Sequence, residues 1–479
     1  MAISWKNSSG HTGTPSNHRP TGTVGRVEHY DLIILGTGSG NSIITPDFDD
    51  WKIAIVEKGV FGGTCLNRGC IPSKMFVYAA DVIEQARHSS KLGVDLSVEG
   101  VRWPDIVDRV FGRIDPIAQG GEDYRQGLEN VTVYKAHARF TGPKTVAVGD
   151  TEISGDHLVI ATGAKPFVPP INGLAQAGYH TSDSIMRLPE VPRRLAVLGG
   201  GYIATEMAHV FEAMGSEVTM LVRGPKLLRG EDEEVSMRFT DVFADRCELI
   251  LGASIDSVHR QDNGELAIEV SVGGDQFQVV ADEILVATGR TPTTEDLDLH
   301  LAGIECHDGY VSTDAAMRTN VEGVWALGDI TNPAQLKHTA NREAKVVAHN
   351  IANPDAMHEV DLWPTPHAVF SHPQVASVGA TEQQLRGEGR PYLVGKRDHA
   401  GTAYGWAMED TSGFCKILVD PETRLILGAH IIGPQAATLI HQLIQGMKFG
   451  QTVDELAEGF LYIHPALSEL VENALLDVG

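Results

Sequence analysis

The chain has 479 residues, of which 42% are hydrophobic and 21% charged, and its formal charge at pH 7 is −25. This length predicts two to four domains with enough apolar surface for their cores. The excess of acidic residues argues against nucleic acid or an anionic membrane as the partner, because neither would be attracted to it. No apolar run reaches the roughly 18 residues that a membrane-spanning helix needs.

The first 28 residues are polar and rich in Gly, Ser, Thr and Pro. They lack the apolar core of a secretory signal. We interpret residues 1–28 as a disordered N-terminal extension.

The first structural signal is YDLIILGTGSGNS, residues 30–42, in which an apolar strand is followed by Gly36, Gly38 and Gly40. The next strand, KIAIVEK, ends at Glu57, close to the spacing of the ribose-binding acid in a dinucleotide fold. Glycines let the backbone approach a pyrophosphate, and we expect a helix to begin directly after them. The third position of the fingerprint is Asn41 instead of Gly or Ala, so the packing of helix on strand should differ slightly there.

The same pattern recurs from residue 194 in RLAVLGGGYIATEMAHVF, with Gly199, Gly201 and Ala204 in the fingerprint positions. A second repeat pairs DHLVIATGAKP (156–166) with DEILVATGRTP (282–292). Each places Thr-Gly at the end of an apolar strand, where an α/β sheet binds ligands. The sequence therefore predicts an α/β protein with two Rossmann-like dinucleotide-binding units.

Later segments change in character. In GVWALGDI the apolar run is closed by Gly328 and Asp329, and this acid either binds a polyol or ribose hydroxyl or belongs to a simple turn. After the segment WPTPH (363–367) the pattern predicts a mixed, largely antiparallel sheet with helices, forming a third domain without a fingerprint.

The strand ends also indicate which nucleotides bind. Glu57 would accept hydrogen bonds from free ribose hydroxyls, which suits FAD in the first unit. The strand EVTMLVR ends in Arg223 and is followed by Lys226 and Arg229, a cluster suited to a 2′-phosphate. A solvated basic loop is the alternative, but we favour NADPH over NADH.

The chain has five cysteines, at positions 65, 70, 247, 306 and 415, too few for a secreted disulfide framework. We therefore expect a reducing cytoplasm. There a close pair such as Cys65 and Cys70 is more often catalytic or metal-binding than structural. Zinc is disfavoured because no second cysteine pair and no paired histidines supply its remaining ligands.

Geometry indicates how Cys65 and Cys70, in GGTCLNRGCIPSK, are held. Residues five apart on an ideal helix have Cα atoms roughly 8–9 Å apart, whereas a disulfide needs less than about 7 Å. An irregular turn must therefore separate them, and Pro72 predicts that a helix begins at about Ile71. Cys70 at a helix N-terminus favours a thiolate. These features favour a reducible, catalytic disulfide, with a pair of inert buried thiols as the alternative.

Arg68, which lies between the two cysteines, would either lower a thiolate pKa or face solvent, and we favour solvent.

Near the C-terminus, IHPALSELVENALL places His464 before a proline and Glu469 at the start of an amphipathic helix. A histidine oriented by a carboxylate is suited to move protons near neutral pH, although spacing alone favours a structural role for it.

Taken in order, GGTCLNRGCIPSK, both fingerprints, the two ATG strands, ALGD and HPALSE resemble the pyridine nucleotide–disulfide oxidoreductases. The resemblance covers about residues 29–479. It implies an FAD-binding domain (29–168 and 290–358), an inserted NADPH-binding domain (169–289) and a C-terminal α+β interface domain (359–479), assembled as a homodimer.

The resemblance also implies residue roles. Cys65 is similar to the interchange thiol and Cys70 to the thiol that contacts flavin, while His464 and Glu469 match an acid–base pair acting from the other subunit. Lys74 and Glu206 match positions near the reactive edge of the flavin. The implied FAD contacts are Gly36, Gly38, Glu57, Thr64, Ala138, Gly163 and Asp329. The implied NADPH contacts are Gly200, Tyr202, Ile203, Arg223, Arg229 and Gly289. No metal is implied.

Within the family, GTGSGNS, KMFVYAADVI, VFGRIDPIAQGGEDYR and AYGWAMEDTSG most resemble the branch that reduces mycothiol disulfide, with NADPH as electron donor. Dihydrolipoamide dehydrogenase and a glutathione reductase-like enzyme are the alternatives, although the former usually has an acid where this chain has Arg223. Mercuric reductase and the large thioredoxin reductases have an extra C-terminal redox pair, and here the last cysteine is Cys415. A flavin-binding structural protein is the alternative from a different class.

Overall fold

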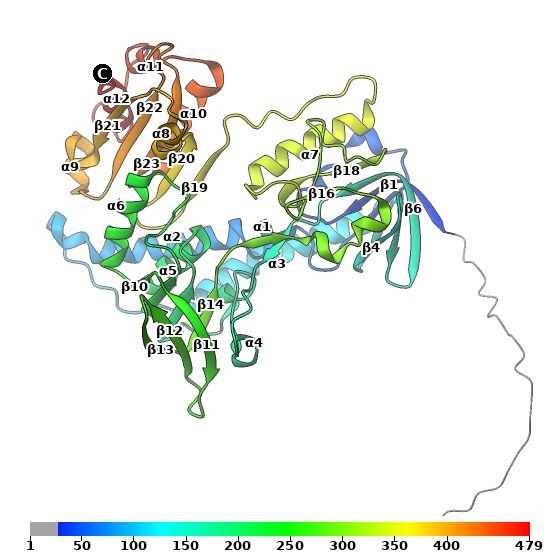
Figure 1. The fold of residues 1–479 in the computed structure, drawn as a ribbon, viewed down its shortest axis with the longest axis horizontal. Coiled ribbons are helices and arrows are strands. Elements are labelled where there is room, and N and C mark those ends of the chain that lie inside the picture. The colour runs from blue at the N-terminus through cyan, green and yellow to red at the C-terminus, as the bar shows by residue number, and fades with distance from the viewer. Residues whose placement is uncertain (1–26) are drawn as a thin grey trace, which may run out of the picture.

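The computed structural model describes residues 27–479. These residues form three large sheets, of seven, four and five strands, and three small sheets of two or three strands. Figure 1 shows how long helices connect the large sheets. The predicted N-terminal extension lies outside the described residues except for its last two, and strand β1 begins at Glu28. Among residues 27–479, no helix combines the length and the apolar character that crossing a bilayer requires.

The first sheet has the strand order β3-β2-β1-β6-β5-β4, with β18 pairing with β6. Its strands are β1 (Glu28–Leu35), β2 (Ile53–Val56), β3 (Val131–Tyr134), β4 (Ala138–Gly142), β5 (Thr145–Val148), β6 (Thr151–Ile160) and β18 (Val324–Ala326). The pairs β1–β2, β2–β3, β1–β6 and β6–β18 are parallel, and β4–β5 and β5–β6 are antiparallel.

Strand β1 is apolar throughout because both of its faces are covered. Leu32 and Ile34 pack in the cluster that contains residues of helix α7 (Lys337–Ala352). Ile33 and Leu35 point to the other face, toward Phe140 of β4. The alternation follows from the pleat of the strand.

The second sheet, of order β10-β9-β8-β14, is entirely parallel. Its strands are β8 (Arg194–Leu198), β9 (Glu217–Val222), β10 (Glu248–Leu251) and β14 (Glu283–Val286). Helices α5 (Tyr202–Ala213) and α6 (Glu233–Ala244) belong to this unit, together with α4 (Leu174–Ala177) and an antiparallel sheet of β11 (Ser254–Arg260), β12 (Leu266–Val272) and β13 (Asp275–Ala281). The strand–glycine–helix order predicted from residue 194 is confirmed.

A short antiparallel pair connects the first two units. Strand β7 (Ala164–Pro166) pairs with β15 (Arg290–Pro292), so the chain leaves the first unit and returns to it at neighbouring points. This topology supports the insertion of residues 169–289, and the domain boundaries remain a proposal.

The C-terminal sheet, of order β19-β20-β23-β22-β21, is antiparallel at every pair, so the largely antiparallel character is confirmed and the expected mixture with parallel pairs is wrong. Its strands are β19 (Pro366–Val369), β20 (Val375–Gly379), β21 (Leu393–Asp398), β22 (Phe414–Val419) and β23 (Ile426–Ile432). Its helices are α8 (Glu382–Glu388), α9 (Ala403–Met408), α10 (Ala436–Phe449), α11 (Val453–Glu458) and α12 (Glu469–Leu476).

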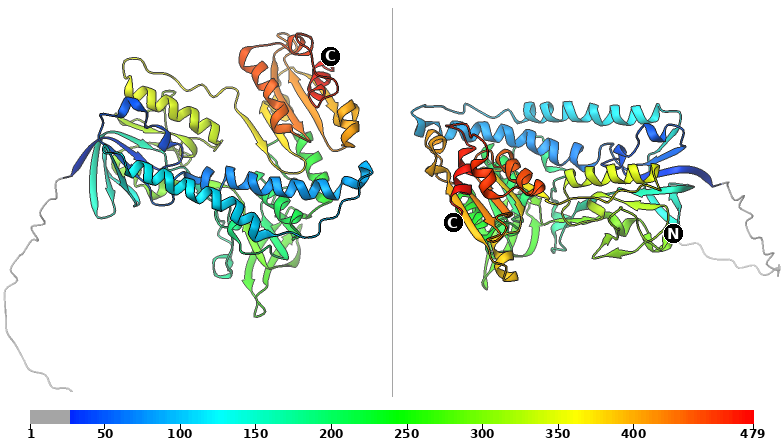
Figure 2. Two further views of the ribbon diagram at one scale, coloured as in Figure 1. Left: turned by 180° about the vertical axis from the view of Figure 1, so that it is seen from behind. Right: turned by 90° about the horizontal axis from the view of Figure 1, so that it is seen from above.

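Helices α2 (Cys70–Arg87) and α3 (Trp103–Gln126) run side by side through the molecule, as Figure 2 shows. Phe76 of α2 and Phe111 of α3 share one buried cluster with Phe211 of α5 and Phe414 of β22. This cluster therefore joins the second and third units around α2.

The prediction of an α-helix directly after the first fingerprint is wrong. In its place are two 3₁₀ helices, η1 (Gly40–Ser42) and η2 (Pro46–Phe48). Pro46 disfavours the α conformation at Thr45, which is extended, so a helix cannot continue. Asn41 accepts a hydrogen bond from Arg125 of α3 at 2.9 Å, which fixes the turn against α3 instead.

Candidate functional site

A cavity of about 1230 Å³ opens where strands β1, β6 and β18 end. Its volume exceeds the roughly 300–1,000 Å³ typical of small-molecule sites, so it has room for an extended dinucleotide. The predicted residues that line it are Gly36, Gly38, Glu57, Thr64, Cys65, Cys70, Lys74, Gly163, Tyr202, Ile203, Glu206, Arg229 and Asp329. Ala138, Gly200, Arg223 and Gly289 lie outside this cavity.

The glycines at the end of β1 allow two stretches of backbone to approach. Gly36 has φ +101°, and a Cβ there would lie 2.4 Å from the carbonyl oxygen of Ala161. A Cβ on Gly63 would lie 2.6 Å from the Cα of Gly38. Side chains at these positions would therefore close the turn that borders the cavity, and the cradle fits a pyrophosphate group.

Glu57 is held in place by its own turn. Its Oε2 accepts hydrogen bonds from the Thr37 amide at 3.0 Å and the Thr37 hydroxyl at 2.7 Å. Its Oε1 accepts one from the Gly59 amide at 2.7 Å. A carboxylate can accept about four hydrogen bonds, so the oriented Glu57 keeps capacity for a ribose hydroxyl, as FAD binding requires.

The two cysteines lie on separate short elements. Cys65 is in helix α1 (Gly63–Asn67), and Arg68 and Gly69 form a non-helical turn after it. Cys70 is the first residue of α2, one residue before the expected start. Both are free thiols in this structure. The irregular turn that a reducible pair needs is therefore present.

The two thiols have opposite pKa shifts. A hydrogen bond from Cys65 lowers the pKa of Cys70 to about 7; burial opposes this shift and the charge of Lys74 supports it. The same hydrogen bond and burial raise the pKa of Cys65. The pair therefore favours a thiolate on Cys70 and a proton on Cys65. The charge of Lys337 of α7, which sequence reasoning missed, opposes the rise in the pKa of Cys65 and adds to the fall in the pKa of Cys70.

Lys74 and Glu206 form an ion pair one turn along α2 from Cys70. The Lys74 ammonium donates to both carboxylate oxygens of Glu206, at 2.7 and 2.8 Å. Glu206 is buried and also accepts a hydrogen bond from the Phe370 amide at 3.0 Å. The pair joins α2, α5 and the C-terminal unit beside the thiols.

Asp329 lies in the 3₁₀ helix η7 (Gly328–Ile330), and Tyr202 begins α5. Burial raises the pKa of both side chains. The charge of Arg290 on β15 opposes both shifts, and its side chain lines the same cavity. Arg290 follows the second ATG strand, so the repeat itself was the signal that would have identified it.

The three residues of the basic cluster in the second unit, Arg223, Lys226 and Arg229, have different surroundings. Arg229 lines the cavity and packs over Gly224, where a Cβ would lie 2.6 Å from the Arg229 Cδ. Arg223 is exposed directly after β9, and Lys226 lies 3.7 Å from Glu233 in an ion pair. Arg229 and Arg223 are therefore the guanidinium groups open to a 2′-phosphate.

Arg68 is 38% exposed and is not among the causes of either thiol's pKa shift. It also lines the cavity and forms an ion pair with Asp183 at 3.2 Å. The sequence did not reveal this partner because Asp183 lies in the segment that leads into the second unit.

His464 and Glu469 are hydrogen-bonded through Nδ1 and Oε1. The pair lies outside the cavity, and the His464 side chain is 72% exposed. Leu461 and Ile463 beside it are 97% and 75% exposed. Within one chain, the structure thus brings the two members of this pair together but does not bring them to the cysteines.

Known proteins share this architecture. The family model "Pyridine nucleotide-disulphide oxidoreductase" matches residues 30–344, and the dimerisation domain of that family matches residues 365–475. Mycothione reductase of Mycobacterium tuberculosis H37Rv is 45% identical over 94% of this chain and 99% of its own length. Dihydrolipoyl dehydrogenase of Chlamydia muridarum is 32% identical over 94% of this chain and 97% of its own length.

Among solved structures, the Cu(II) complex of the HOCl-induced flavoprotein disulfide reductase RclA from Escherichia coli has a TM-score of 0.83 and 27% identity. The alignment covers 94% of this chain and all of that chain. Proteins of this family use FAD and a pyridine nucleotide. With two dinucleotide-binding units, a dimerisation domain and this similarity, the chain belongs to the pyridine nucleotide–disulfide oxidoreductase family of flavoprotein enzymes.

Proposed function

We propose that this enzyme uses NADPH to reduce mycothiol disulfide to mycothiol, through a redox disulfide between Cys65 and Cys70. The observation that carries the proposal is the pair of free thiols, Cys65 and Cys70, in the cavity wall, one helical turn from the Lys74–Glu206 ion pair. The 45% identity to a mycothione reductase along nearly the whole chain supports the choice of substrate.

Residues in the cavity are suited to hold both nucleotides. Gly36, Gly38 and Glu57 would hold the pyrophosphate and ribose of FAD. Arg229 would hold the 2′-phosphate of NADPH together with Arg223, which is exposed outside the cavity directly after β9. When bound, these cofactors supply the electron pair that reduces the cysteine disulfide. Arg223 stands where relatives that use NAD usually have an acid, so it favours NADPH over a dihydrolipoyl dehydrogenase activity.

The reduced pair then acts on the substrate. The Cys65 sulfur attacks one sulfur of the disulfide, forms a mixed disulfide and releases the first thiol. Cys70 next attacks Cys65, which restores the protein disulfide and releases the second thiol. The raised pKa of Cys65 means that a base must take its proton before it attacks, while the lowered pKa of Cys70 makes it a ready thiolate.

His464 supplies that base in the proposal, and its imidazolium then protonates the leaving thiolate to give the first thiol. Because His464 lies outside the cavity of its own chain, it would act on the cysteines of a second subunit in a homodimer. The dimerisation domain and the exposed Leu461 and Ile463 support this arrangement. A reducing cytoplasm is the compartment in which such a cycle would operate.

The test is NADPH oxidation by the FAD-loaded enzyme with mycothiol disulfide, glutathione disulfide and lipoamide. The proposal expects turnover that is highest with mycothiol disulfide and NADPH, and that is lost in Cys65→Ser. Preference for lipoamide with NADH, or indifference to mycothiol disulfide, would refute the substrate assignment.

A further inference from the structure

An ion pair that the reaction above does not use lies in the wall of the same cavity. His367 of β19 and Glu231, just before α6, are linked between Nε2 and Oε1 at 2.8 Å. Both residues line the cavity beside Arg229. The pair connects the second unit to the C-terminal sheet, and sequence reasoning missed it because its members are 136 positions apart.

Glu231 is buried, and both of its carboxylate oxygens are bonded to the C-terminal sheet. The Ser377 hydroxyl donates to Oε2 at 2.6 Å, and Ser377 pairs with His367 across strands β19 and β20. His430 lies 3.1 Å from the same hydroxyl through Nδ1. Removing His367 would therefore leave a buried carboxylate with one partner fewer, which is costly.

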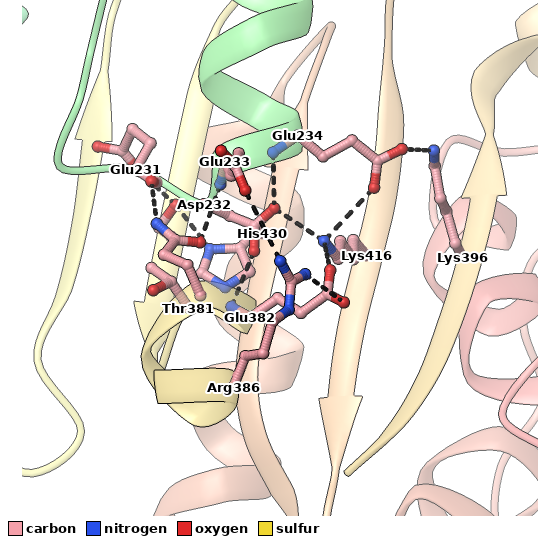
Figure 3. A network of polar contacts seen from close by, with 12 residues as sticks. Glu231, Asp232, Glu233, Glu234, Thr381, Glu382, Arg386, Lys396, Lys416 and His430 are labelled. Carbon is pink, nitrogen blue, oxygen red and sulfur yellow. Dashed lines mark hydrogen bonds and ion pairs between the residues drawn. The ribbon is translucent and has the colours of Figure 1, made fainter. Parts of the chain in front are cut away.

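The next residue, Asp232, is anchored in the same way, as Figure 3 shows. It is fully buried, accepts a hydrogen bond from the buried Lys416 ammonium at 2.9 Å and one from the Glu382 amide at 3.0 Å. It also caps α6 by accepting from the Glu234 amide. Residues 231 and 232 are thus fixed to the C-terminal unit by their side chains.

Arg229 lies in the short turn that these anchors hold. Leu228 has φ +48°, its amide donates to the Gly200 carbonyl at 2.8 Å, and the Glu231 amide donates to the Leu228 carbonyl at 2.9 Å. The turn is therefore held by the fingerprint loop at its start and by His367 at its end. Arg229, between these points, is the cavity-lining guanidinium expected to bind the 2′-phosphate.

We propose that His367 and Glu231 are positioning residues for the pyridine nucleotide: the ion pair fixes the turn 228–232 and so holds Arg229 where it binds the 2′-phosphate. This inference rests on the proposed use of NADPH. It assigns to His367 no contact with the reacting atoms. Its effect is on the affinity for the nucleotide, and it is larger for NADPH than for NADH.

The pair also makes this affinity depend on pH. Burial lowers the pKa of His367, but the hydrogen bond and charge of Glu231 outweigh burial and raise it. The imidazolium–carboxylate pair is therefore complete below the ordinary histidine pKa of about 6.5 and weakens as pH rises through the raised value. Glu231 is the charged group that acts on His367. His338 of α7 and His441 of α10 also line the cavity. On the other side of Glu231 are His430, which acts on the pKa of Glu231, and the next residue, Asp232.

The test follows anaerobic reduction of the FAD-loaded enzyme by NADPH or NADH in a stopped-flow instrument, without any disulfide substrate. In His367→Ala we expect the Kd for NADPH at pH 7 to rise about fivefold, the Kd for NADH to change less than about twofold, and the limiting rate to be retained. His259→Ala, an exposed histidine of β11, is the matched control and should match the wild type.

His367→Gln keeps an amide donor for Glu231 but cannot titrate. Between pH 7 and 9, where the 2′-phosphate stays fully charged, the Kd for NADPH should rise in the wild type and rise less in His367→Gln. The thermal melt and the FAD content of each variant show whether it is folded.

The outcomes separate the two proposals. An unchanged Kd for NADPH in His367→Ala, or equal losses for NADPH and NADH with loss of FAD, would overturn the positioning role while the proposed function stands. A wild-type flavin that neither nucleotide reduces would overturn the proposed function and this inference with it.

Discussion

The hydrogen bond between the two cysteines should control the reactivity of Cys70. It is the largest cause of the low pKa of Cys70, about 7, ahead of the charge of Lys74. Replacing Cys65 with alanine removes the donor, whereas Cys65→Ser keeps an O–H donor at the same position. The two variants therefore separate the hydrogen bond from all other effects of the site.

The magnitude follows from the type of bond. A hydrogen bond to a charged group contributes about 1.5–3 kcal/mol. One pKa unit corresponds to about 1.4 kcal/mol, so the alanine variant should titrate about one to two pH units higher than the serine variant.

The assay is the rate of iodoacetamide alkylation of Cys70 as a function of pH, followed by peptide mass spectrometry. Cys306 is exposed and should be replaced by serine in every sample. Cys247 and Cys415 are buried with raised pKa values and should react slowly. Equal midpoints for Cys65→Ala and Cys65→Ser would refute the reasoning and assign the shift to Lys74 and the helix N-terminus.

Three further predictions concern other parts of the molecule. Arg229→Ala should raise the KM for NADPH about tenfold and leave that for NADH within about twofold, because only the 2′-phosphate contact is lost; equal changes for both would exclude that contact. Lys416→Met leaves the buried Asp232 unpaired and should lower the free energy of unfolding by about 3–5 kcal/mol, seen as a lower urea midpoint, whereas an unchanged midpoint would show that the ion cluster contributes little. His464→Ala should lower disulfide turnover about 10²–10⁴-fold while reduction by NADPH keeps its rate, and a loss in both half-reactions would contradict its role as a proton donor.

Much of the architecture could be predicted from local patterns. Glycines at the ends of β1 and β8 marked the two nucleotide-binding units, and Pro72 placed the start of α2 to within one residue. These features depend on neighbours in the sequence, so a short window contains the cause. The same logic failed at Pro46, where a nearby proline replaced the expected helix with 3₁₀ turns.

The rest of the site depends on contacts between distant segments. Arg68 carries no local sign of Asp183, and Glu231 carries none of His367 or Ser377. These pairs form only when the three units meet around α2, because each pair joins residues from different segments of the chain. The depression of the Cys70 pKa likewise needs the distance between two thiols, which spacing in the sequence does not fix.

The central claim, that Cys65 and Cys70 cycle between disulfide and dithiol, is tested most directly by counting their thiols. Before and after one equivalent of NADPH, the FAD-loaded enzyme is alkylated anaerobically in denaturant, where the folded-state pKa shift of Cys65 is lost, and the label on each cysteine is quantified. The account predicts no label on Cys65 and Cys70 in the oxidised enzyme and labelling of both after reduction. Equal labelling before and after NADPH would contradict it.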